Sequence, residues 1–174
     1  MKHLYCILFF LISIDSIAQN MQYQKLVDEG LQFLDQKNIA DAIDKYQQAF
    51  KIDSNKVEAN YGLGVAYQYY CQTQGKDCLL ALYYIEKAIK IDDTYRNCYY
   101  SRAGIKTLLK DYKGAIKDFN KAIFKSPEKA HYYVGRAPTY LKLDMREDAC
   151  KDLKKAAELN SEIAKALLIS QGCN

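Results

Sequence analysis

Apolar and small residues recur at steps of three and four along most of the chain, which is the spacing of helices with one buried face. In DAIDKYQQAFKID, residues 41–53, these positions are Ala42, Ile43, Tyr46, Ala49, Phe50 and Ile52. The segments AIKDFNKAIFKSP and ACKDLKKAAELN repeat the pattern farther along the chain. No stretch of the sequence alternates apolar and polar residues with the period of two that is typical of a strand. The pattern therefore predicts an all-α protein.

Small residues at matched positions indicate that pairs of helices are repeated. One set, in the first helix of each pair, has steps of 34, 39 and 34: Gly30, Gly64, Ala103 and Ala137. Two sets in the second helices have steps of 39, 34 and 34: Ala42, Ala81, Ala115 and Ala149, and Ala49, Ala88, Ala122 and Ala156. The period is therefore 34 residues, with five extra residues between Gly64 and Ala81. Alanine at matched positions lets neighbouring helices approach closely.

A 34-residue period of helix pairs, with small residues at fixed positions, resembles the tetratricopeptide repeat family. The resemblance covers residues 23 to about 163, as the units 23–56, 57–95, 96–129 and 130–163. It implies a right-handed α-solenoid of four helix-turn-helix repeats plus a C-terminal capping helix at about residues 161–171. The second unit, with its five extra residues, is also similar to Sel1-like repeats, in which the helical hairpins have longer spacing.

Single residues mark helix ends and departures from the family pattern. Ser126-Pro127-Glu128 predicts an N-cap, a proline at the first helical position and an acidic first turn of a helix. Asn160-Ser161-Glu162 predicts the start of a further short helix. Lys106 stands where the first helix of the family has an aromatic residue. Pro138 falls inside the first helix of the fourth unit, where it should remove one backbone hydrogen bond.

The first residues, MKHLYCILFFLISIDSIAQN, form a separate segment. After Lys2 the chain is apolar from residue 4 to Ile14 apart from Ser13, a run too short to span a bilayer, which needs about 20 residues. This length, followed by the small residues of Ser16-Ile17-Ala18, is typical of a signal peptide. We expect residues 1–18 to be removed by cleavage after Ala18, leaving residues 19–174 as the repeat domain. An uncleaved anchor and a buried N-terminal helix are the alternatives.

Charge and tyrosine content narrow the choice of partners. The chain has 25 basic and 21 acidic residues, and its formal net charge of +4 is spread without a block of like charge. This distribution indicates neither a nucleic-acid partner nor a membrane surface, and we expect no membrane insertion after signal cleavage. The chain has 16 tyrosines and no tryptophan. Tyrosine suits half-buried faces that meet partners, and packing in the core is the alternative role for most of these residues.

The sequence lacks motifs that carry chemistry. His131 is the one histidine outside residues 1–18, whereas a histidine-based metal site needs several ligands. No serine-hydrolase elbow, Walker-type phosphate loop or dinucleotide-binding glycine motif occurs. A nucleophilic cysteine would need a base, for which the distant His131 is a poor candidate. We therefore expect no cofactor, no metal and no catalysis, with a small thiol-dependent enzyme as an alternative.

The resemblance to tetratricopeptide repeats also implies a concave binding surface, which the first helices line. Such a surface takes a protein or peptide partner, as an extended segment or as a helix. The matching positions are Asp28, Leu31, Glu58, Tyr61, Val65, Tyr69, Asn97, Tyr100, Ser101, His131 and Val134. Tyr61 and Tyr100 occupy equivalent positions in adjacent units and are the expected anchors. Some family members grip a C-terminal carboxylate with a basic and amide clamp. This mode is not indicated here, because the clamp positions hold Val27, Leu31, Gly62, Asn97 and Ser101.

Five cysteines lie outside residues 1–18, and their places relative to the helices predict two disulfides. First helices run one way and second helices run back, so helix ends alternate between two rims of the solenoid. Cys71 closes a first helix and Cys78 opens the next second helix, which places both on one rim. Cys150 opens the last second helix and Cys173 follows the capping helix, on that same rim. We predict disulfides Cys71–Cys78 and Cys150–Cys173, with Cys98 on the opposite rim as the free thiol.

The sequence as a whole predicts an exported, non-catalytic protein–protein interaction module that is periplasmic or secreted. A structural subunit of a cell-envelope assembly, with its repeats buried in a larger complex, is an alternative with the same fold. A four-thiol zinc site is the alternative for the cysteines, but it would need the two pairs to meet across an intervening repeat. A redox switch would lack the C-x-x-C spacing.

Overall fold

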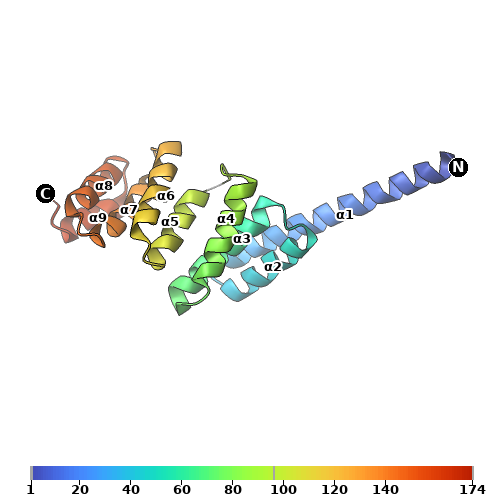
Figure 1. Cartoon of the computed structure of the whole chain (residues 1–174), viewed down its shortest axis with the longest axis horizontal. Helices are drawn as coiled ribbons and strands as arrows, with labels where there is room; N and C mark the ends of the chain where they lie inside the picture. Colours follow the sequence, from blue (N-terminus) through green and yellow to red (C-terminus); the bar gives the residue numbers. More distant parts are fainter. Residues whose placement is uncertain (1, 96, 174) are drawn as a thin grey trace.

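Helices packed in pairs make up this computed structural model, which describes residues 2–95 and 97–173 (Figure 1). Side chains are described from residue 15 onward, so the apolar run of the expected signal peptide, residues 4–14, lies outside the described side chains. The described residues form helices and no strand. The helices are α1 (Lys2–Asp35), α2 (Ile39–Ile52), α3 (Val57–Gln74), α4 (Cys78–Ile91), α5 (Cys98–Leu108), α6 (Tyr112–Lys125), α7 (Ala130–Leu141), α8 (Arg146–Glu158) and α9 (Glu162–Ser170).

The helix pairs stand side by side along the molecule (Figure 1). Each of α1, α3, α5 and α7 packs against the helix that follows it, and α9 packs against α8. The first helices of successive pairs also contact one another, α1 with α3, α3 with α5 and α5 with α7. They therefore form one continuous layer. This is the all-α solenoid of four helical hairpins and a final helix that the sequence predicts.

The small residues of the repeat are buried where helices meet. The second-helix alanines of both matched sets are between 0% and 5% exposed. A Cβ atom built on Gly64 would lie 2.5 Å from side-chain atoms of Ile85, closer than real Cβ contacts, so α3 and α4 approach through the missing side chain. Larger residues at one second-helix position fill the interior of each hairpin: Tyr46, Ile85, Phe119 and Leu153.

The start of α7 differs from the sequence prediction. Ser126 is the C-cap of α6 and not the N-cap of the next helix, which begins at Ala130. The Lys129 N–H donates to the Ser126 carbonyl at 3.3 Å, which closes a four-residue turn with Pro127 in its second position. Proline favours this position of a β-turn because its φ angle is already set. The predicted N-cap was therefore wrong because a serine–proline pair suits a turn as well as a helix start.

A second repeated position joins the two helices of a hairpin through charge. In three hairpins, residues 16 apart form an ion pair: Glu29–Lys45, Arg102–Asp118 and Arg136–Asp152. The first pair has the opposite polarity to the other two. In the second hairpin the same positions hold Leu63 and Tyr84, which lie in one apolar cluster. The same two positions therefore pair in each hairpin, whereas the residues that occupy them are oppositely charged in three hairpins and apolar or aromatic in the second.

Lys106, which departs from the family pattern, belongs to this network. Its Nζ lies 2.7 Å from Oδ2 of Asp118, whose carboxylate also accepts two hydrogen bonds from Arg102, at 2.6 and 2.8 Å. Asp118 is 4% exposed, so its charge requires partners. At the position of the family's aromatic residue, this lysine supplies a second cation to the buried carboxylate of Asp118.

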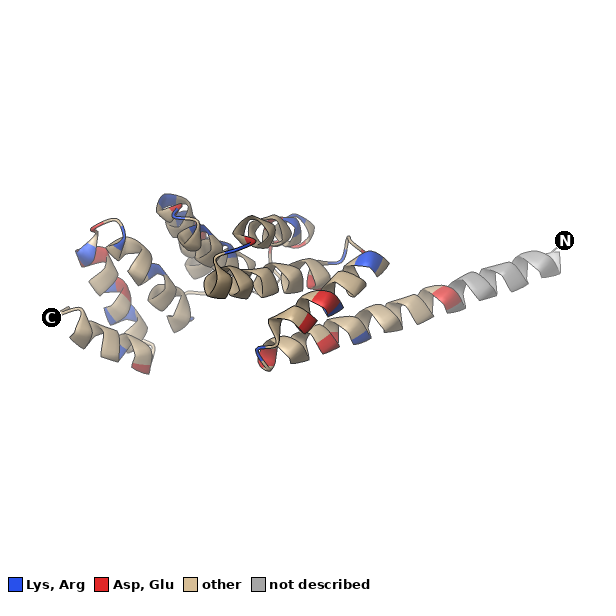
Figure 2. Cartoon of the chain, turned by 90° about the horizontal axis from the view of Figure 1, so that it is seen from below, with Lys and Arg blue, Asp and Glu red and all other residues tan. Residues whose placement is uncertain are grey.

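Charges of both signs are distributed along the hairpins (Figure 2). In α1, residues 15–22 are all exposed, and Tyr23 is the first buried residue in the described part of the helix. Among the described residues, no helix has an apolar stretch long enough to cross a membrane.

Candidate functional site

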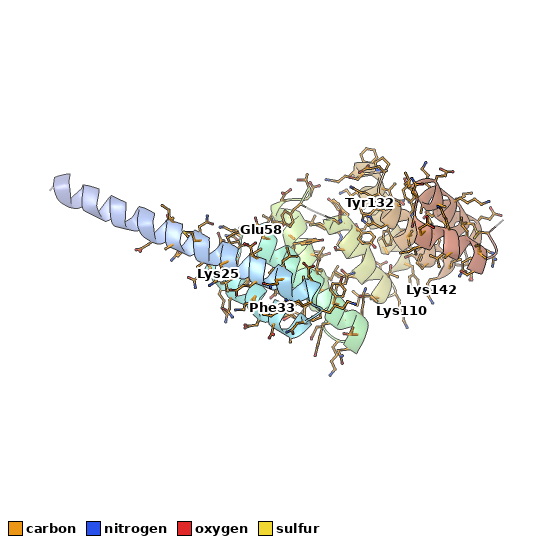
Figure 3. All side chains as sticks on the ribbon, turned by 180° about the vertical axis from the view of Figure 1, so that it is seen from behind. Lys25, Phe33, Glu58, Lys110, Tyr132 and Lys142 are labelled. Carbon is orange, nitrogen blue, oxygen red and sulfur yellow. A yellow bond between two sulfur atoms is a disulfide. The ribbon has the colours of Figure 1, made fainter. Side chains whose placement is uncertain are left out.

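The ends of the hairpins lie at two edges of the molecule. Figure 3 places Glu58 and Tyr132, near the starts of α3 and α7, at one edge. Lys110 and Lys142, which follow α5 and α7, lie at the opposite edge (Figure 3). The first helices therefore run in the same direction between these edges, and their side chains on one face form a continuous surface.

Two adjoining pockets lie on the surface of the first helices. The acidic pocket, as we name the first, has a volume of about 320 Å³ and extends from α1 to α3. The tyrosine pocket has a volume of about 360 Å³ and extends from α3 across α5 to the start of α7. Tyr61, Val65 and Tyr69 of α3 line both pockets. The two pockets together are called the groove below.

The groove brings together the residues expected to face a partner, with one exception. The acidic pocket is lined by Asp28, Leu31, Glu58 and the three shared residues of α3. The tyrosine pocket adds Asn97, Tyr100, Ser101 and His131. Val134 lines neither pocket, because it packs against the buried cluster that contains Tyr133 and Leu153. Whether the groove residues bind a partner stays a prediction.

Helical periodicity explains two groove residues that the sequence analysis missed. Gln68 and Gln72 follow Tyr61 and Val65 at steps of three and four on the same face of α3, and both line the tyrosine pocket. The amide of Gln68 crosses to α5, since a Cβ atom built on Gly104 would lie 2.7 Å from its Nε2. Extending the step from Val65 along α3 would have identified both glutamines.

A loop residue also lines the acidic pocket. Tyr95 lies between α4 and α5, and its ring meets the ring of Tyr61 edge to face with centroids 5.4 Å apart. The Tyr61 hydroxyl lies 3.5 Å from Oγ of Ser101 on α5. No helical pattern predicts where a residue of this loop lies, so Tyr95 could not be identified from the sequence.

The described lining of the tyrosine pocket contains no carboxylate, lysine or arginine. The Tyr100 ring meets His131 and Phe119 edge to face, with centroids 5.2 and 5.7 Å apart. Burial raises the pKa of Tyr100, and desolvation lowers the pKa of His131, with Lys129 as the second cause. Tyr69, in contrast, is 47% exposed, so its ring is the most accessible of the tyrosines that line the pocket.

The acidic pocket carries negative charge. Its described lining includes the carboxylates of Asp28, Asp35 and Glu58 and no lysine or arginine. Asp28 accepts a hydrogen bond from Nε2 of Gln24 at 2.9 Å, and Glu58 accepts one from the Tyr23 hydroxyl at 3.2 Å. Within the described part of the chain, none of the three carboxylates lies within ion-pair distance of a lysine or arginine.

Tyr23 fixes the position of α1 against the start of α3. Besides donating to Glu58, its hydroxyl accepts a hydrogen bond from the Ala59 N–H at 3.1 Å. The ring is 1% exposed, and burial raises the pKa of the hydroxyl. Tyr23 therefore joins α1 to the start of α3 beside Glu58, which lines the acidic pocket.

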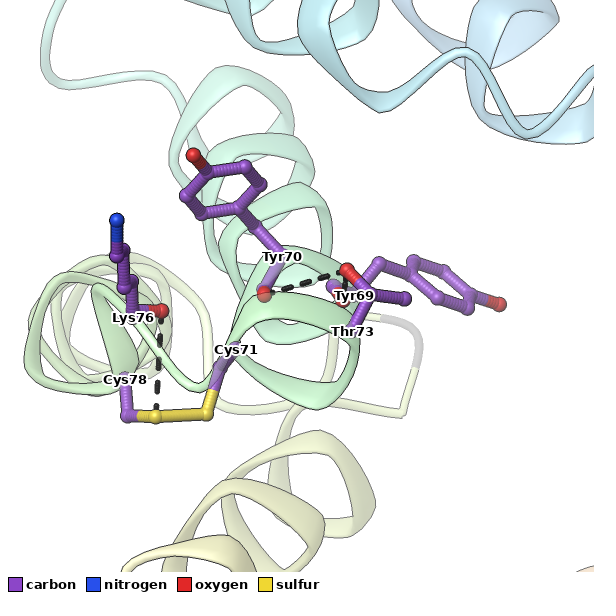
Figure 4. Close-up of a disulfide and its surroundings, with 6 residues drawn as sticks. All are labelled: Tyr69, Tyr70, Cys71, Thr73, Lys76 and Cys78. Carbon is purple, nitrogen blue, oxygen red and sulfur yellow. Dashed lines mark hydrogen bonds between the residues drawn. A yellow bond between two sulfur atoms is a disulfide. The ribbon is translucent and has the colours of Figure 1, made fainter.

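Two disulfides lie at hairpin ends. Cys71 is joined to Cys78 across the turn between α3 and α4, with Cα atoms 5.0 Å apart (Figure 4). Thr73 Oγ1, beside this bond, donates to the carbonyl of Tyr69 at 3.0 Å (Figure 4). Cys150 is joined to Cys173, with Cα atoms 5.4 Å apart. These are the pairs named in the sequence analysis, and they hold the extended second hairpin and the end of the chain.

Cys98 is the free cysteine in the described part of the chain. It is 1% exposed, and its thiol donates to the carbonyl of Tyr95 at 2.9 Å. Burial raises the pKa of the thiol to about 12, with the charges of Asp92 and Asp93 as further causes. Among the described residues, no three histidine, cysteine or acidic side chains gather as they would around a metal ion.

Comparisons with known proteins agree with the geometry. Residues 30–68 match the family model described as "TPR repeat". The chain is 27% identical over 113 residues to "Sperm-associated antigen 1" of Homo sapiens, covering 64% of this chain and 11% of that protein. It is 42% identical over 59 residues to "Protein STIP1 homolog" of Dictyostelium discoideum, covering 34% of this chain and 10% of that protein. The chain thus spans only a small part of both relatives.

Solved structures share the fold at low sequence identity. "MamA 41-end from Desulfovibrio magneticus RS-1" superposes with a TM-score of 0.70 at 19% identity, covering 79% of this chain and 75% of that one. The PilF structure from Pseudomonas aeruginosa has a TM-score of 0.69 at 20% identity, covering 82% and 63%. The Cut9–Hcn1 structure has a TM-score of 0.75 at 19% identity, covering 86% and 30%. At these identities the likeness concerns the fold alone.

Proposed function

We propose that this chain, a member of the tetratricopeptide repeat family, is an exported, non-catalytic module that binds a segment of another protein in its groove. The observation that carries the proposal is the groove itself, in which two pockets on the first helices share the α3 residues Tyr61, Val65 and Tyr69. Tyrosines beside aliphatic and amide side chains favour a peptide or a helix, because they give apolar contact and hydrogen bonds together.

The state of the cysteines supports a binding role over a thiol-dependent enzyme. A catalytic cysteine needs an accessible thiolate, which a lowered pKa provides. Four cysteines form the two disulfides, and Cys98 is buried with a raised pKa. The enzyme alternative therefore has no described cysteine with the required chemistry.

Export is the part of the proposal that concerns the N-terminal segment. Residues 15–22 are exposed, so cleavage after Ala18 would remove no buried side chain among the described residues. The two disulfides favour an oxidising compartment, such as the periplasm or the outside of the cell. We therefore retain cleavage after Ala18 and a periplasmic or secreted location as proposals.

Site-specific photo-crosslinking tests the binding role and separates it from the structural-subunit alternative. Benzoylphenylalanine would replace Tyr69 in the groove or, as a matched aromatic control, Phe124, which is 87% exposed on α6. The proposal predicts an adduct with a partner protein after irradiation of the Tyr69 variant and none with the Phe124 variant. Adducts at Phe124 alone would favour packing of the outer helices in an assembly and would contradict the groove.

A further inference from the structure

We propose that the groove selects a basic, extended peptide segment whose lysine or arginine side chains enter the acidic pocket. This inference rests on the proposed function and specifies the chemistry of the partner. The four first helices, at about 10 Å between axes, span about 30 Å. An extended peptide of about 9 residues covers this length. The segment therefore reaches both pockets at once.

Charge complementarity is the first argument for a basic segment. Asp28, Asp35 and Glu58 face one pocket whose described lining residues include no lysine or arginine, although the whole chain carries a formal charge of +4. The groove is therefore locally opposite in sign to the molecule. An acidic peptide would bring unpaired like charges together, whereas a cationic side chain gains charge-assisted hydrogen bonds.

The basic side chains of the neighbouring first helices already bind other groups of the protein. Arg102 and Lys106 bind Asp118, and Arg136 binds Asp152, inside the hairpins. Lys56, which precedes α3, lies over the ring of Tyr23 with its Nζ 4.2 Å from the centroid, and it donates to Asn20. Among the described residues, these contacts occupy the basic side chains nearest the pocket, and no lysine or arginine forms an ion pair with its carboxylates.

The tyrosines of the groove give a second and independent argument. The faces of tyrosine rings attract cations, and arginine also stacks on them. Tyr61 and Tyr69 line the acidic pocket as well as the tyrosine pocket, so a cationic side chain in the first would meet both a carboxylate and a ring. The tyrosine pocket, with Gln68, Gln72 and Asn97, then holds the apolar and amide parts of the same segment.

Three fluorescein-labelled peptides of about 9 residues test the inference by fluorescence anisotropy. They share the same apolar residues and differ in the remaining positions, which hold arginine and lysine, glutamine, or glutamate. We expect the basic peptide to bind about tenfold more tightly than the glutamine peptide, as three partly exposed charge contacts would give, and the glutamate peptide to bind most weakly. Raised salt should reduce the difference.

A matched pair of variants assigns the charge effect to the groove. The triple variant Asp28→Asn, Asp35→Asn and Glu58→Gln should bind the basic and glutamine peptides equally. The control Asp44→Asn, Glu86→Gln and Glu147→Gln makes the same change in net charge on second helices and should keep the tenfold preference. Circular dichroism establishes that both variants are folded.

Other outcomes would overturn the inference, and they separate it from the proposed function. If the glutamine or glutamate peptide binds as tightly as the basic one and Tyr69→Ala weakens binding, the charge preference is wrong and the groove function stands. If the basic peptide binds and neither Tyr69→Ala nor the triple groove variant weakens it, both are wrong. If none of the three peptides binds, the inference is wrong as well.

Discussion

The ion pair between Arg136 and Asp152 gives the most specific stability prediction. The same register position holds a pair of opposite polarity, Glu29–Lys45, in the first hairpin. We predict that Arg136→Glu or Asp152→Lys alone destabilises the protein, whereas the double variant Arg136→Glu/Asp152→Lys recovers a large part of the loss. The double variant copies the arrangement of the first hairpin into the fourth.

The geometry of the pair sets the magnitude. Nε and Nη2 of Arg136 donate to the two carboxylate oxygens of Asp152 at 2.7 and 2.6 Å, and the side chains are 14% and 7% exposed. Burial raises the pKa of Asp152, so the carboxylate depends on the guanidinium for its charge. Placing like charges here should cost about 3 kcal/mol of unfolding free energy. The double variant should recover about half of it, because lysine lacks the planar fork of arginine.

Urea unfolding followed by circular dichroism measures these differences, and thermal unfolding gives a second readout. A loss of about 3 kcal/mol corresponds to a decrease of about 6–12 °C in Tm for a domain of this size. A further control, Arg136→Leu/Asp152→Tyr, copies Leu63 and Tyr84 of the second hairpin and should stay near wild-type stability. If the single variants are as stable as wild type, the ion pair does not stabilise the fourth hairpin. If the double variant loses as much unfolding free energy as the two single variants together, the reversed pair cannot replace it.

Three further predictions concern the cysteines and the N-terminus. At pH 8 the thiol of Cys98 should react with iodoacetamide about a thousandfold more slowly than an ordinary thiol, because burial raises its pKa to about 12. Unfolding in urea should remove this protection. Fast labelling of the native protein would contradict the burial of Cys98. Alkylation in urea of mature, unreduced protein, followed by peptide mass analysis, should label Cys98 alone, whereas labelling of all five cysteines would refute the disulfides. Reduction of Cys150–Cys173 should lower the unfolding free energy by about 3 kcal/mol. N-terminal sequencing of protein recovered from the cell envelope or medium should begin at Gln19, and an N-terminus at Met1 would contradict cleavage.

The sequence predicted the solenoid because close packing imposes small residues at a fixed period. A larger side chain at Gly64 would collide with Ile85, so the residue type at such positions reports the contact directly. The same reasoning placed Cys71 and Cys78 on one rim, since helix direction follows from the repeat. These features depend on backbone packing, which a period can reveal.

Features that depend on competing local structures or on long side chains were not predictable in the same way. Ser126 suits a turn and an N-cap equally, and only the start of α7 at Ala130 distinguishes them. Tyr95 reaches the groove from a loop that has no periodicity. The pairs Arg102–Asp118 and Arg136–Asp152 repeat at the 34-residue period, so they could have been found from identical residues, whereas the reversed pair in the first hairpin could not.

Chemical-shift mapping tests the groove most directly. The amide signals of 15N-labelled protein would be assigned and followed by NMR during titration with the basic peptide described above. The account predicts shifts concentrated on the lining residues of α1, α3 and α5, with Val65, Tyr69 and Ser101 among the largest. Shifts confined to the second helices α4, α6 and α8, with the groove residues unchanged, would contradict it.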